Sequence, residues 1–348
     1  MEGQMESQMR VVFLGTPEFA VGPLKKLIAE TEVVAVYSQP DKPVGRGLKM
    51  QASPVKQIAL ENNIPVFTPE KISIPEEVAR LKEFNPDFIV VVAYGQILKM
   101  SVIEVPKFGI VNIHSSLLPR WRGAAPIQWS ILGGDKETGV TTMMIVPKLD
   151  AGDILLQEKT PISADDTAES VHDRLSEIGA RLIVPTLRGL RDGTLKRIGQ
   201  DESKVTYAHK LTKEMEQLLY TESAREIDLK VRALNPWPGT KIEVKTPLND
   251  ASIVSRGEPL SLSSTLKIKI KKGRPIADAP LRVREGELVS SGGQLLMGCA
   301  DSVYQIIELQ EEGKKAVLGS DFLNSLKNRG LSLPLQLKLP TANSGETA

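Results

Sequence analysis

The first half of the chain alternates short apolar runs with amphipathic segments, and this alternation constrains the fold more than any other feature. We predict buried strands at residues 11–15, 33–38 and 88–93. We predict helices between them, at residues 20–30, 55–62 and 76–84. Continuously apolar strands separated by helices are typical of a parallel sheet that is covered on both faces. With right-handed crossovers, the sequence therefore predicts a doubly wound, Rossmann-like α/β domain.

The turn after the first predicted strand limits what this domain can bind. It reads Gly15-Thr16-Pro17 rather than Gly-x-Gly-x-x-Gly. Dinucleotide-binding domains use that glycine pattern to bring the backbone close to a pyrophosphate. A dinucleotide site is therefore not expected, and we interpret Gly15 as the residue that lets the chain turn sharply into a helix.

A change of pattern near residue 192 predicts a second domain. A helix over 167–190 is followed by a polar segment, and a further helix over 213–234 ends at a segment containing Pro236 and Pro238, which cannot continue it. Short strands follow, at 241–244, 265–270, 287–290, 294–299 and 303–309. This spacing favours a small β-barrel. We predict an α/β domain over 1–192, a linker over 193–211, a barrel over 212–330 and a flexible tail over 331–348.

Composition excludes several classes of protein. The 348 residues suffice for two domains, and 44 Lys and Arg residues nearly balance 43 Asp and Glu residues, so global charge neither favours nor excludes a nucleic-acid partner. The single cysteine, Cys299, excludes an intrachain disulfide, and with only three scattered histidines no metal site is expected. The polar segment 1–10 does not resemble a signal peptide, and no apolar stretch is long enough to cross a bilayer. We therefore expect a cytoplasmic protein without membrane contact.

An amide and an imidazole lie two residues apart where a predicted strand over 110–114 meets a turn. Side chains alternate along a strand, so Asn112 and His114 share one face. An amide donor beside a titratable base suits acyl-transfer chemistry. The alternative is that His114 is a core residue with its hydrogen bonds satisfied, which is the more common role of a lone buried histidine.

A second segment could complete such a site. Residues 140–146 form a predicted strand, and the loop Leu149-Asp150-Ala151-Gly152-Asp153 leaves it. A carboxylate at Asp150 or Asp153 could hold the imidazole in one tautomer or accept a proton itself. The alternative is that both carboxylates cap a turn, as Asp often does before Gly. The spacing alone leaves these interpretations open.

Together these residues carry a resemblance to a known family. Asn112, His114 and Asp150, with Ser116-Leu117-Leu118-Pro119 between them, resemble the catalytic core of the folate-dependent formyltransferases. The run Leu-Pro-Arg-Trp-Arg-Gly-Ala-Ala-Pro-Ile-Gln over 118–128 resembles more narrowly the members that act on methionyl-tRNA. Further similar segments are 12–20, 45–47, 53–56, 234–239 and 309–315. The chain departs from the family pattern at 146–149 and Ala151, and the segment after about residue 330 has no counterpart.

The resemblance implies formyl transfer from 10-formyltetrahydrofolate to the amino group of methionine on initiator tRNA, by a monomer that needs no metal. It makes residues 1–192 the catalytic domain and 212–330 an OB-like tRNA-binding domain. Asn112 would donate to the oxyanion, and His114 would stabilise the same charge or protonate the leaving folate nitrogen. Asp150 would orient His114 and accept the amine proton. The residues expected in the folate pocket are Ser116, Leu117, Leu118, Pro119, Val92 and Tyr94.

Two basic segments are candidates for tRNA contact. In the loop 41–50, Arg46 stands between two glycines, where its guanidinium can reach a phosphate or a base edge. On the predicted strand 265–270, Lys267 and Lys269 alternate with apolar residues and share an exposed face. The alternatives are an ordinary solvated loop and an edge strand protected by lysine. The resemblance favours tRNA contact for Arg46, Lys49, Lys267, Lys269 and Lys271.

Two other functions fit parts of this pattern. A related enzyme that formylates an amino sugar nucleotide or glycinamide ribonucleotide would share Asn112, His114 and Asp150. The Arg46 loop, the run 121–126 and the basic barrel distinguish these possibilities. A non-catalytic tRNA-binding protein is a rival from another class, and the pairing of Asn-x-His with a carboxylate disfavours it because simple binding needs neither.

Overall fold

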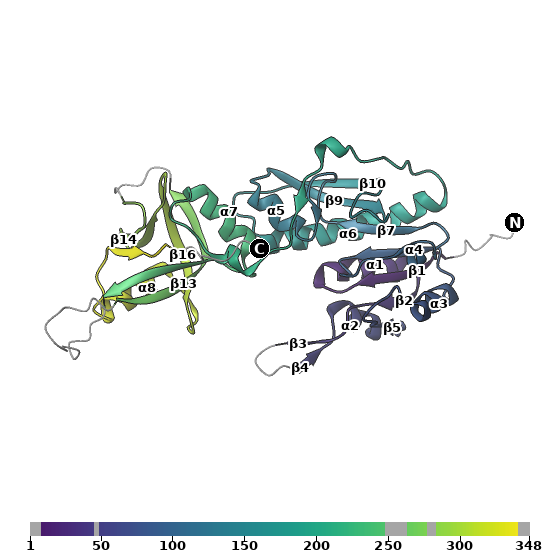
Figure 1. Cartoon of the computed structure of the whole chain (residues 1–348), viewed down its shortest axis with the longest axis horizontal. Helices are drawn as coiled ribbons and strands as arrows, with labels where there is room; N and C mark the ends of the chain where they lie inside the picture. Colours follow the sequence, from purple (N-terminus) through teal and green to yellow (C-terminus); the bar gives the residue numbers. More distant parts are fainter. Residues whose placement is uncertain (1–7, 45–48, 248–262, 277–282, 340–348) are drawn as a thin grey trace, which may run out of the picture. The chain divides into compact units, whose positions relative to one another are not determined.

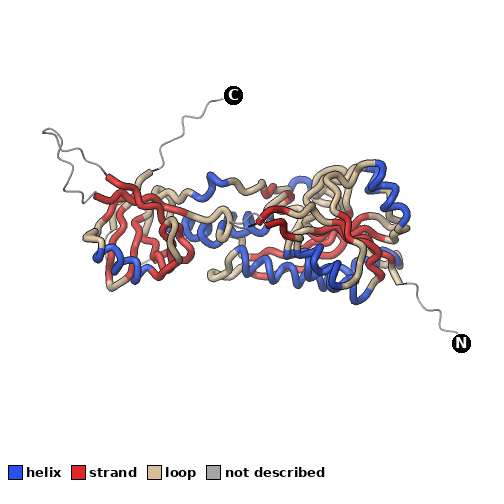
Figure 2. Tube along the Cα trace, turned by 90° about the horizontal axis from the view of Figure 1, so that it is seen from below, coloured by secondary structure: helices blue, strands red, loops and turns tan. Residues whose placement is uncertain are grey.

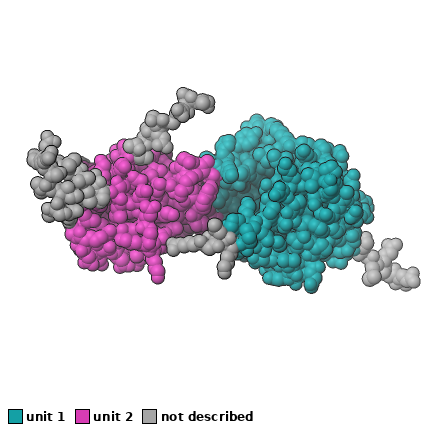
Figure 3. All heavy atoms as spheres, turned by 60° about the horizontal axis from the view of Figure 1, so that its bottom comes forward, with its two compact units in different colours: residues 1–130, 135–164, 170–210 teal, residues 131–134, 165–169, 211–348 magenta. Residues whose placement is uncertain are grey.

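The structure is a computed structural model that describes residues 8–44, 49–247, 263–276 and 283–339. It divides the chain into two compact units, which Figure 3 colours separately. The first unit comprises residues 1–130, 135–164 and 170–210, and the second comprises 131–134, 165–169 and 211–348. Strands form the centre of each unit, and helices lie outside them (Figure 2).

A seven-stranded sheet forms the centre of the first unit, in the order β10-β9-β7-β6-β1-β2-β5 (Figure 1). The parallel strands are β1 (Arg10–Gly15), β2 (Glu32–Tyr37), β5 (Val66–Phe67), β6 (Phe88–Val92) and β7 (Ile110–His114). At one edge, β9 (Glu137–Met144) pairs antiparallel with β7, and β10 (Ile154–Pro161) pairs antiparallel with β9. The doubly wound, Rossmann-like domain predicted from the apolar runs is confirmed, with these two antiparallel pairings added at one edge.

Helices cover both faces of this sheet. The helices of this part of the chain are α1 (Val21–Glu30), α2 (Pro54–Glu61), α3 (Pro75–Glu83), α4 (Met100–Ile103), α5 (Pro126–Leu132) and α6 (Ala168–Arg191), with the 3₁₀ turns η1 (Glu18–Ala20) and η2 (Glu202–Lys204). Alternate strand residues such as Val12, Ile89 and Ile110 pack in one core cluster with residues of α3 and α4. Side chains on the opposite face pack against α6. A Cβ atom added at Gly179 of this helix would lie 2.9 Å from the side chain of Ile113 on β7. A residue's position along a strand therefore decides which helices it faces.

Two small strand pairs lie outside the main sheet. The strands β3 (Lys42–Val44) and β4 (Lys49–Gln51) form a hairpin. The strands β8 (Arg122–Gly123) and β11 (Tyr207–Ala208) pair in parallel although 85 residues separate their first members. The pairing of β8 with β11 holds the segment near residue 207 against the segment that follows β7.

A closed antiparallel barrel forms the second unit. Its strands follow the order β13-β12-β18-β14-β15-β16, and β16 pairs back with β13. They are β12 (Lys241–Pro247), β13 (Ser263–Ile276), β14 (Glu287–Ser291), β15 (Gln294–Gly298), β16 (Val303–Glu311) and β18 (Leu335–Leu337), with β17 (Ala316–Leu318) beside β16. Helix α7 (Ala224–Leu234) packs on β13, and α8 (Gly319–Asn328) packs on β15 and β16. The predicted barrel is confirmed, and closure removes the exposed strand edges that would otherwise pair with other chains.

Three local expectations differ from the structure. The helix predicted over 213–234 begins only at Ala224, because Ser223 and Glu226 form a capping box there, and a 3₁₀ turn η3 (Lys213–Glu216) precedes it. The prediction of a flexible tail from residue 331 is wrong for 331–339: β18 pairs with β12 and β14, and buries Leu335 and Leu337. The linker predicted over 193–211 is largely fastened to the first unit, through β11 and a bridge between Ile198 and Ile154. Within the described residues, no helix is long and apolar enough to span a bilayer.

Candidate active site

Strand β7 positions the predicted amide and imidazole. It lies between β6, where Val91 is the neighbour of Asn112, and β9, where Thr141 is the neighbour of His114. Because Ile110 belongs to the core cluster with α3 and α4, Asn112 and His114 also face that side of the sheet. The imidazole is only 6% exposed, whereas Asn112 is half-buried. The expectation that both side chains share one face is confirmed by this register.

The two ring nitrogens of His114 have different partners. Nε2 lies 2.9 Å from the backbone oxygen of Trp121. A carbonyl oxygen can only accept, so Nε2 carries a proton and donates it. Nδ1 lies 3.8 Å from Oδ2 of Asp150, close enough for an ion pair when the ring is protonated but too far for a direct hydrogen bond. The nitrogen free to exchange a proton is therefore Nδ1, the one that faces the carboxylate.

The loop between β9 and β10 brings Asp150 to the imidazole. Asp150 adopts the left-handed conformation, with φ of 46°, which Asp tolerates better than most residues. Its Oδ2 accepts a hydrogen bond of 2.8 Å from the backbone N–H of Gly123. For the carboxylate of Asp153, by contrast, no hydrogen bond or ion pair joins it to another described residue. The choice between the two carboxylates that the sequence left open thus falls on Asp150.

Glycines are required at two points around this loop. Gly123 has φ of 125°, and a Cβ there would lie 2.5 Å from the oxygen of Ala208. A Cβ at Gly152 would lie 1.8 Å from the oxygen of Met144. Real Cβ atoms cannot approach a backbone oxygen so closely, so any larger residue must displace the backbone. Gly123 therefore allows β8 to lie close to β11, and Gly152 allows the Asp150 loop to lie close to the end of β9.

The predicted folate residues occupy two different environments. Ser116 and Leu118 are buried: the Ser116 hydroxyl donates to the oxygen of Arg120, and Leu118 packs with Met143 and Ile154. Leu117 and Pro119 are half-buried. These four residues form the turn that directly follows His114, so a substrate beside the imidazole would meet this turn through its backbone and its half-buried side chains.

The other two predicted folate residues lie at the end of β6. Val92 is fully buried and Tyr94 is 1% exposed, packed in the core cluster beside α4. Burial raises the pKa of the Tyr94 hydroxyl, which has no hydrogen-bond partner among the residues that the structure describes. Within the described part of the chain, Tyr94 accepts hydrogen bonds only through its backbone oxygen, from the side chains of Thr16 and Gln39. Any contribution of Tyr94 to a substrate pocket must therefore come from the backbone.

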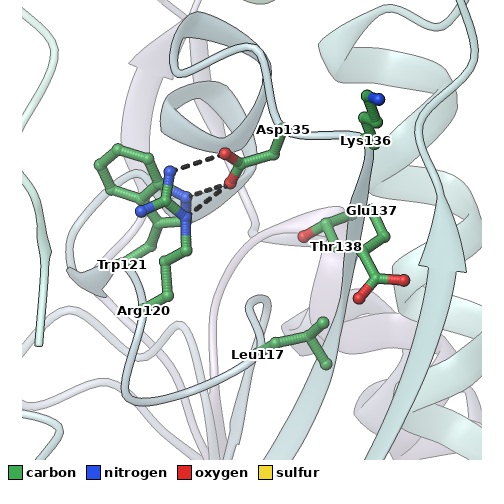
Figure 4. A pocket seen from close by; sticks show the side chains of 7 residues that line it. All are labelled: Leu117, Arg120, Trp121, Asp135, Lys136, Glu137 and Thr138. Carbon is green, nitrogen blue, oxygen red and sulfur yellow. Dashed lines mark hydrogen bonds and ion pairs between the residues drawn. The ribbon is translucent and has the colours of Figure 1, made fainter. Parts of the chain in front are cut away.

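A cavity of about 260 Å³ lies beside this turn (Figure 4). Its lining residues are Leu117, Arg120, Trp121, Asp135, Lys136, Glu137 and Thr138. Asp135 accepts hydrogen bonds from the guanidinium of Arg120 and from the indole of Trp121, drawn as dashed lines in Figure 4. None of Asn112, His114 and Asp150 lines this cavity, so we do not place the chemistry in it.

The predicted tRNA residues are only partly within the described residues. Arg46 lies outside them, and Lys49 belongs to β4 but its side chain is not among those described. On β13, Lys267 and Lys269 are exposed and alternate with the fully buried Ile268 and Ile270. Lys271 is half-buried. The alternation predicted from the sequence is confirmed, so the barrel presents these two lysines to solvent.

Sequence reasoning missed the residues that hold the Asp150 loop. Gln200 donates a hydrogen bond to the backbone of the loop, and Arg122 is linked to the loop through Gln200. Gly123 supplies the N–H that binds the carboxylate. Gln200 lies in the segment interpreted as a linker, and no local pattern marks it.

Exposed apolar side chains were also missed: Ile97, on the loop after β6, is 89% exposed, and Leu149, beside Asp150, is 64% exposed. Among the described residues, no group of three or more His, Cys, Asp and Glu side chains could hold a metal ion.

Comparisons with known proteins show which family the chain belongs to. The formyl transferase family matches residues 9–187, and the formyl transferase C-terminal domain matches residues 210–327. The chain belongs to the formyl transferase family. Among its relatives, the methionyl-tRNA formyltransferase of Methylococcus capsulatus is 45% identical over 91% of this chain and 97% of that protein. The methionyl-tRNA formyltransferase of Hydrogenovibrio crunogenus is 42% identical over 94% of this chain and 100% of that protein.

Solved structures share the fold at low sequence identity. A sugar 3N-formyl transferase, solved with dTDP and 5-N-formyl-THF, superposes with a TM-score of 0.59 at 19% identity, over 88% of this chain and 99% of that one. HypX from Aquifex aeolicus in complex with tetrahydrofolic acid superposes with a TM-score of 0.57 at 16% identity, over 96% of this chain and 51% of that one. At such identities the likeness supports the fold alone.

Proposed function

We propose that this protein transfers the formyl group of 10-formyltetrahydrofolate to the amino group of methionyl initiator tRNA. Relatives named methionyl-tRNA formyltransferase match both units, over nearly their whole length. The observation that carries the chemistry is the approach of His114 Nδ1 to Asp150 Oδ2, at 3.8 Å, on the face of β7 that also carries Asn112. We place the reaction beside these three side chains, in a cytoplasmic monomer that uses no metal.

The reaction needs a path for two protons. Attack by the amine on the formyl carbon forms the new C–N bond and a tetrahedral oxyanion, which the amide N–H of Asn112 stabilises. Asp150 accepts the proton that the amine loses. Protonated His114 delivers the proton from Nδ1 to the folate nitrogen as the old C–N bond breaks. The proton on Asp150 then returns to Nδ1, so the enzyme ends as it began.

This division of roles follows from the hydrogen bonds of the imidazole. Nε2–H is held by the Trp121 carbonyl, so the ring cannot rotate to offer it to the substrate. An oxyanion-hole donor contributes about 100- to 1,000-fold to a rate, and general acid–base catalysis contributes about 100- to 10,000-fold. These two terms are the contributions that we assign to Asn112 and to the His114–Asp150 pair.

Other features suit the two substrates. We assign the folate to the turn 116–119 and the end of β6, with the exposed apolar side chains of Ile97, on the loop after β6, and Leu149, next to Asp150, as further contacts. The pteridine ring of a folate has flat faces that such side chains can cover, while its polar edge needs hydrogen bonds. We assign the tRNA to the Arg46–Lys49 loop and to the lysines of β13, because exposed cations neutralise phosphates along a nucleic-acid backbone.

The test compares acceptors and a catalytic variant. Purified protein with 10-formyltetrahydrofolate should formylate methionyl initiator tRNA much faster than the elongator form or an amino sugar nucleotide. His114→Ala should lower turnover by about 100- to 10,000-fold while its circular dichroism spectrum and Tm stay close to those of the wild type. Faster transfer to the amino sugar nucleotide, or near-normal turnover of the variant, would refute the proposal.

A further inference from the structure

The side-chain amide of Gln200 lies between a buried arginine and the loop that carries Asp150. Its Nε2 donates two hydrogen bonds of 2.8 Å, to the backbone oxygens of Asp150 and Gly152. Its Oε1 accepts from Nε and Nη2 of Arg122, at 3.0 and 2.8 Å. Carbonyl oxygens only accept and guanidinium groups only donate, so the amide has a single orientation that satisfies all four bonds.

Arg122, the partner of Gln200, is itself held in place by several contacts. Its side chain is fully buried, and Nη2 also donates to the carboxylate of Glu202 at 2.9 Å. Its backbone N–H donates to the oxygen of Thr206, within the pairing of β8 and β11. A buried, ion-paired guanidinium on a hydrogen-bonded strand has few alternative positions. Gln200 therefore ties the Asp150 loop to a rigid part of the unit.

Asp150 is held at two points by neighbouring residues of one strand. Its carboxylate binds the N–H of Gly123, and its backbone oxygen is linked to Arg122 through Gln200. The left-handed backbone of Asp150 is a sparsely populated conformation for a residue other than glycine, and these two contacts favour it. The gap of 3.8 Å between carboxylate and imidazole depends on where this backbone lies.

We propose that Gln200 is a positioning residue for Asp150: it holds the loop so that the carboxylate faces Nδ1 of His114. The inference rests on the proposed function, since it takes Asp150 to act on the proton of the amine. Gln200 touches neither substrate nor His114 in this role. Its effect on the reaction is carried by the backbone of Asp150 and Gly152.

The Gln200→Glu variant separates this role from simple support of the buried arginine. Glu has nearly the same shape and accepts from Arg122 as an ion pair, but an ionised carboxylate cannot donate to the two loop oxygens. We expect a kcat lowered by about 10- to 100-fold, the scale of a misplacement of about 1 Å in an active site. The KM values for both substrates should stay within about threefold, and Tm should not fall. Asp201→Asn is the matched control, because that side chain contacts Ser203 and Lys204 and not the loop.

Two further measurements keep the outcomes distinct. In an Asp150→Asn background, Gln200→Glu should lower kcat by less than about twofold more, because a positioning residue has nothing left to position. Hydrogen–deuterium exchange of residues 147–153 tests the tie without the reaction: it should quicken in Gln200→Glu and stay unchanged in Asp201→Asn.

Each result bears on one proposal. A wild type that transfers no formyl group overturns the proposed function and leaves the exchange experiment to decide the tie. An active wild type with an unaffected Gln200→Glu kcat overturns the positioning role, as does an additive loss in the Asp150→Asn background. Unchanged exchange in residues 147–153 overturns the tie itself.

Discussion

Replacing Asp150 with Asn isolates the charge that faces the imidazole of His114, to which we assign the proton transfer. The amide oxygen of Asn can still accept from the N–H of Gly123, and Asn also tolerates a φ of 46°. The loop should therefore keep its place, and only the negative charge is lost. Two mostly buried unit charges 3.8 Å apart interact by about 4 kcal/mol at an effective dielectric constant of about 20.

That interaction energy sets the size of the loss that comes from the charge on the imidazole alone; the loss of the proton acceptor adds to it. Since about 1.4 kcal/mol corresponds to a factor of ten in rate, kcat should fall by about 1,000-fold or more. Single-turnover formyl transfer at saturating concentrations of both substrates measures it. Asp153→Asn makes the same chemical change on the same loop, and should leave kcat within about twofold of the wild type.

Three results would refute this reasoning. A kcat for Asp150→Asn within tenfold of the wild type would mean that the charge does not act on the imidazole. A loss of equal size in Asp153→Asn would mean that the effect belongs to the loop as a whole. A Tm lowered by more than about 5 °C in Asp150→Asn would show that folding, rather than charge, had changed.

Three further predictions concern the surroundings of the site. Gly152→Ala should cost at least about 2 kcal/mol and lower Tm in thermal unfolding, because its Cβ would meet the Met144 oxygen at 1.8 Å, whereas Gly199→Ala, with open space around it, should not. Tyr94→Phe should leave the KM for folate unchanged and Tm unchanged or slightly higher, because the buried hydroxyl has no partner among the described residues; a raised KM would contradict this placement. Hydrogen bonds from Arg122 and Lys148 lower the pKa of Glu202 to about 2, from a usual value of 4.5. Its ion pairs should therefore stabilise the fold above pH 4.5 and lose this effect as pH falls toward 2. The difference in unfolding free energy between the wild type and Glu202→Gln should shrink over that range. A difference that stays constant would contradict this prediction.

The parts of the fold that the sequence predicts are those encoded by short-range periodicity. The strands predicted over 11–15 and 88–93 match β1 and β6 within one residue at each end, because apolar period and turn residues act locally. The same period of two places Asn112 and His114 on one face and Lys267 and Lys269 on another. The strand at 335–337 escaped prediction, because three residues carry too little pattern and their pairing depends on a barrel that other strands build.

The candidate active site also has a part that the sequence predicts and a part that depends on long-range packing. The sequence by itself determined the residue types and the shared face of β7, because neighbouring positions on a strand have a fixed geometry. Only the tertiary structure decided that Asp150 rather than Asp153 meets the imidazole, that the Trp121 carbonyl holds Nε2, and that Gln200 supports the loop. The contacts of Asp150 with Gly123 and Gln200 join residues 27 and 50 positions apart. Contacts at such separations depend on how the whole chain packs, and local sequence pattern does not encode them.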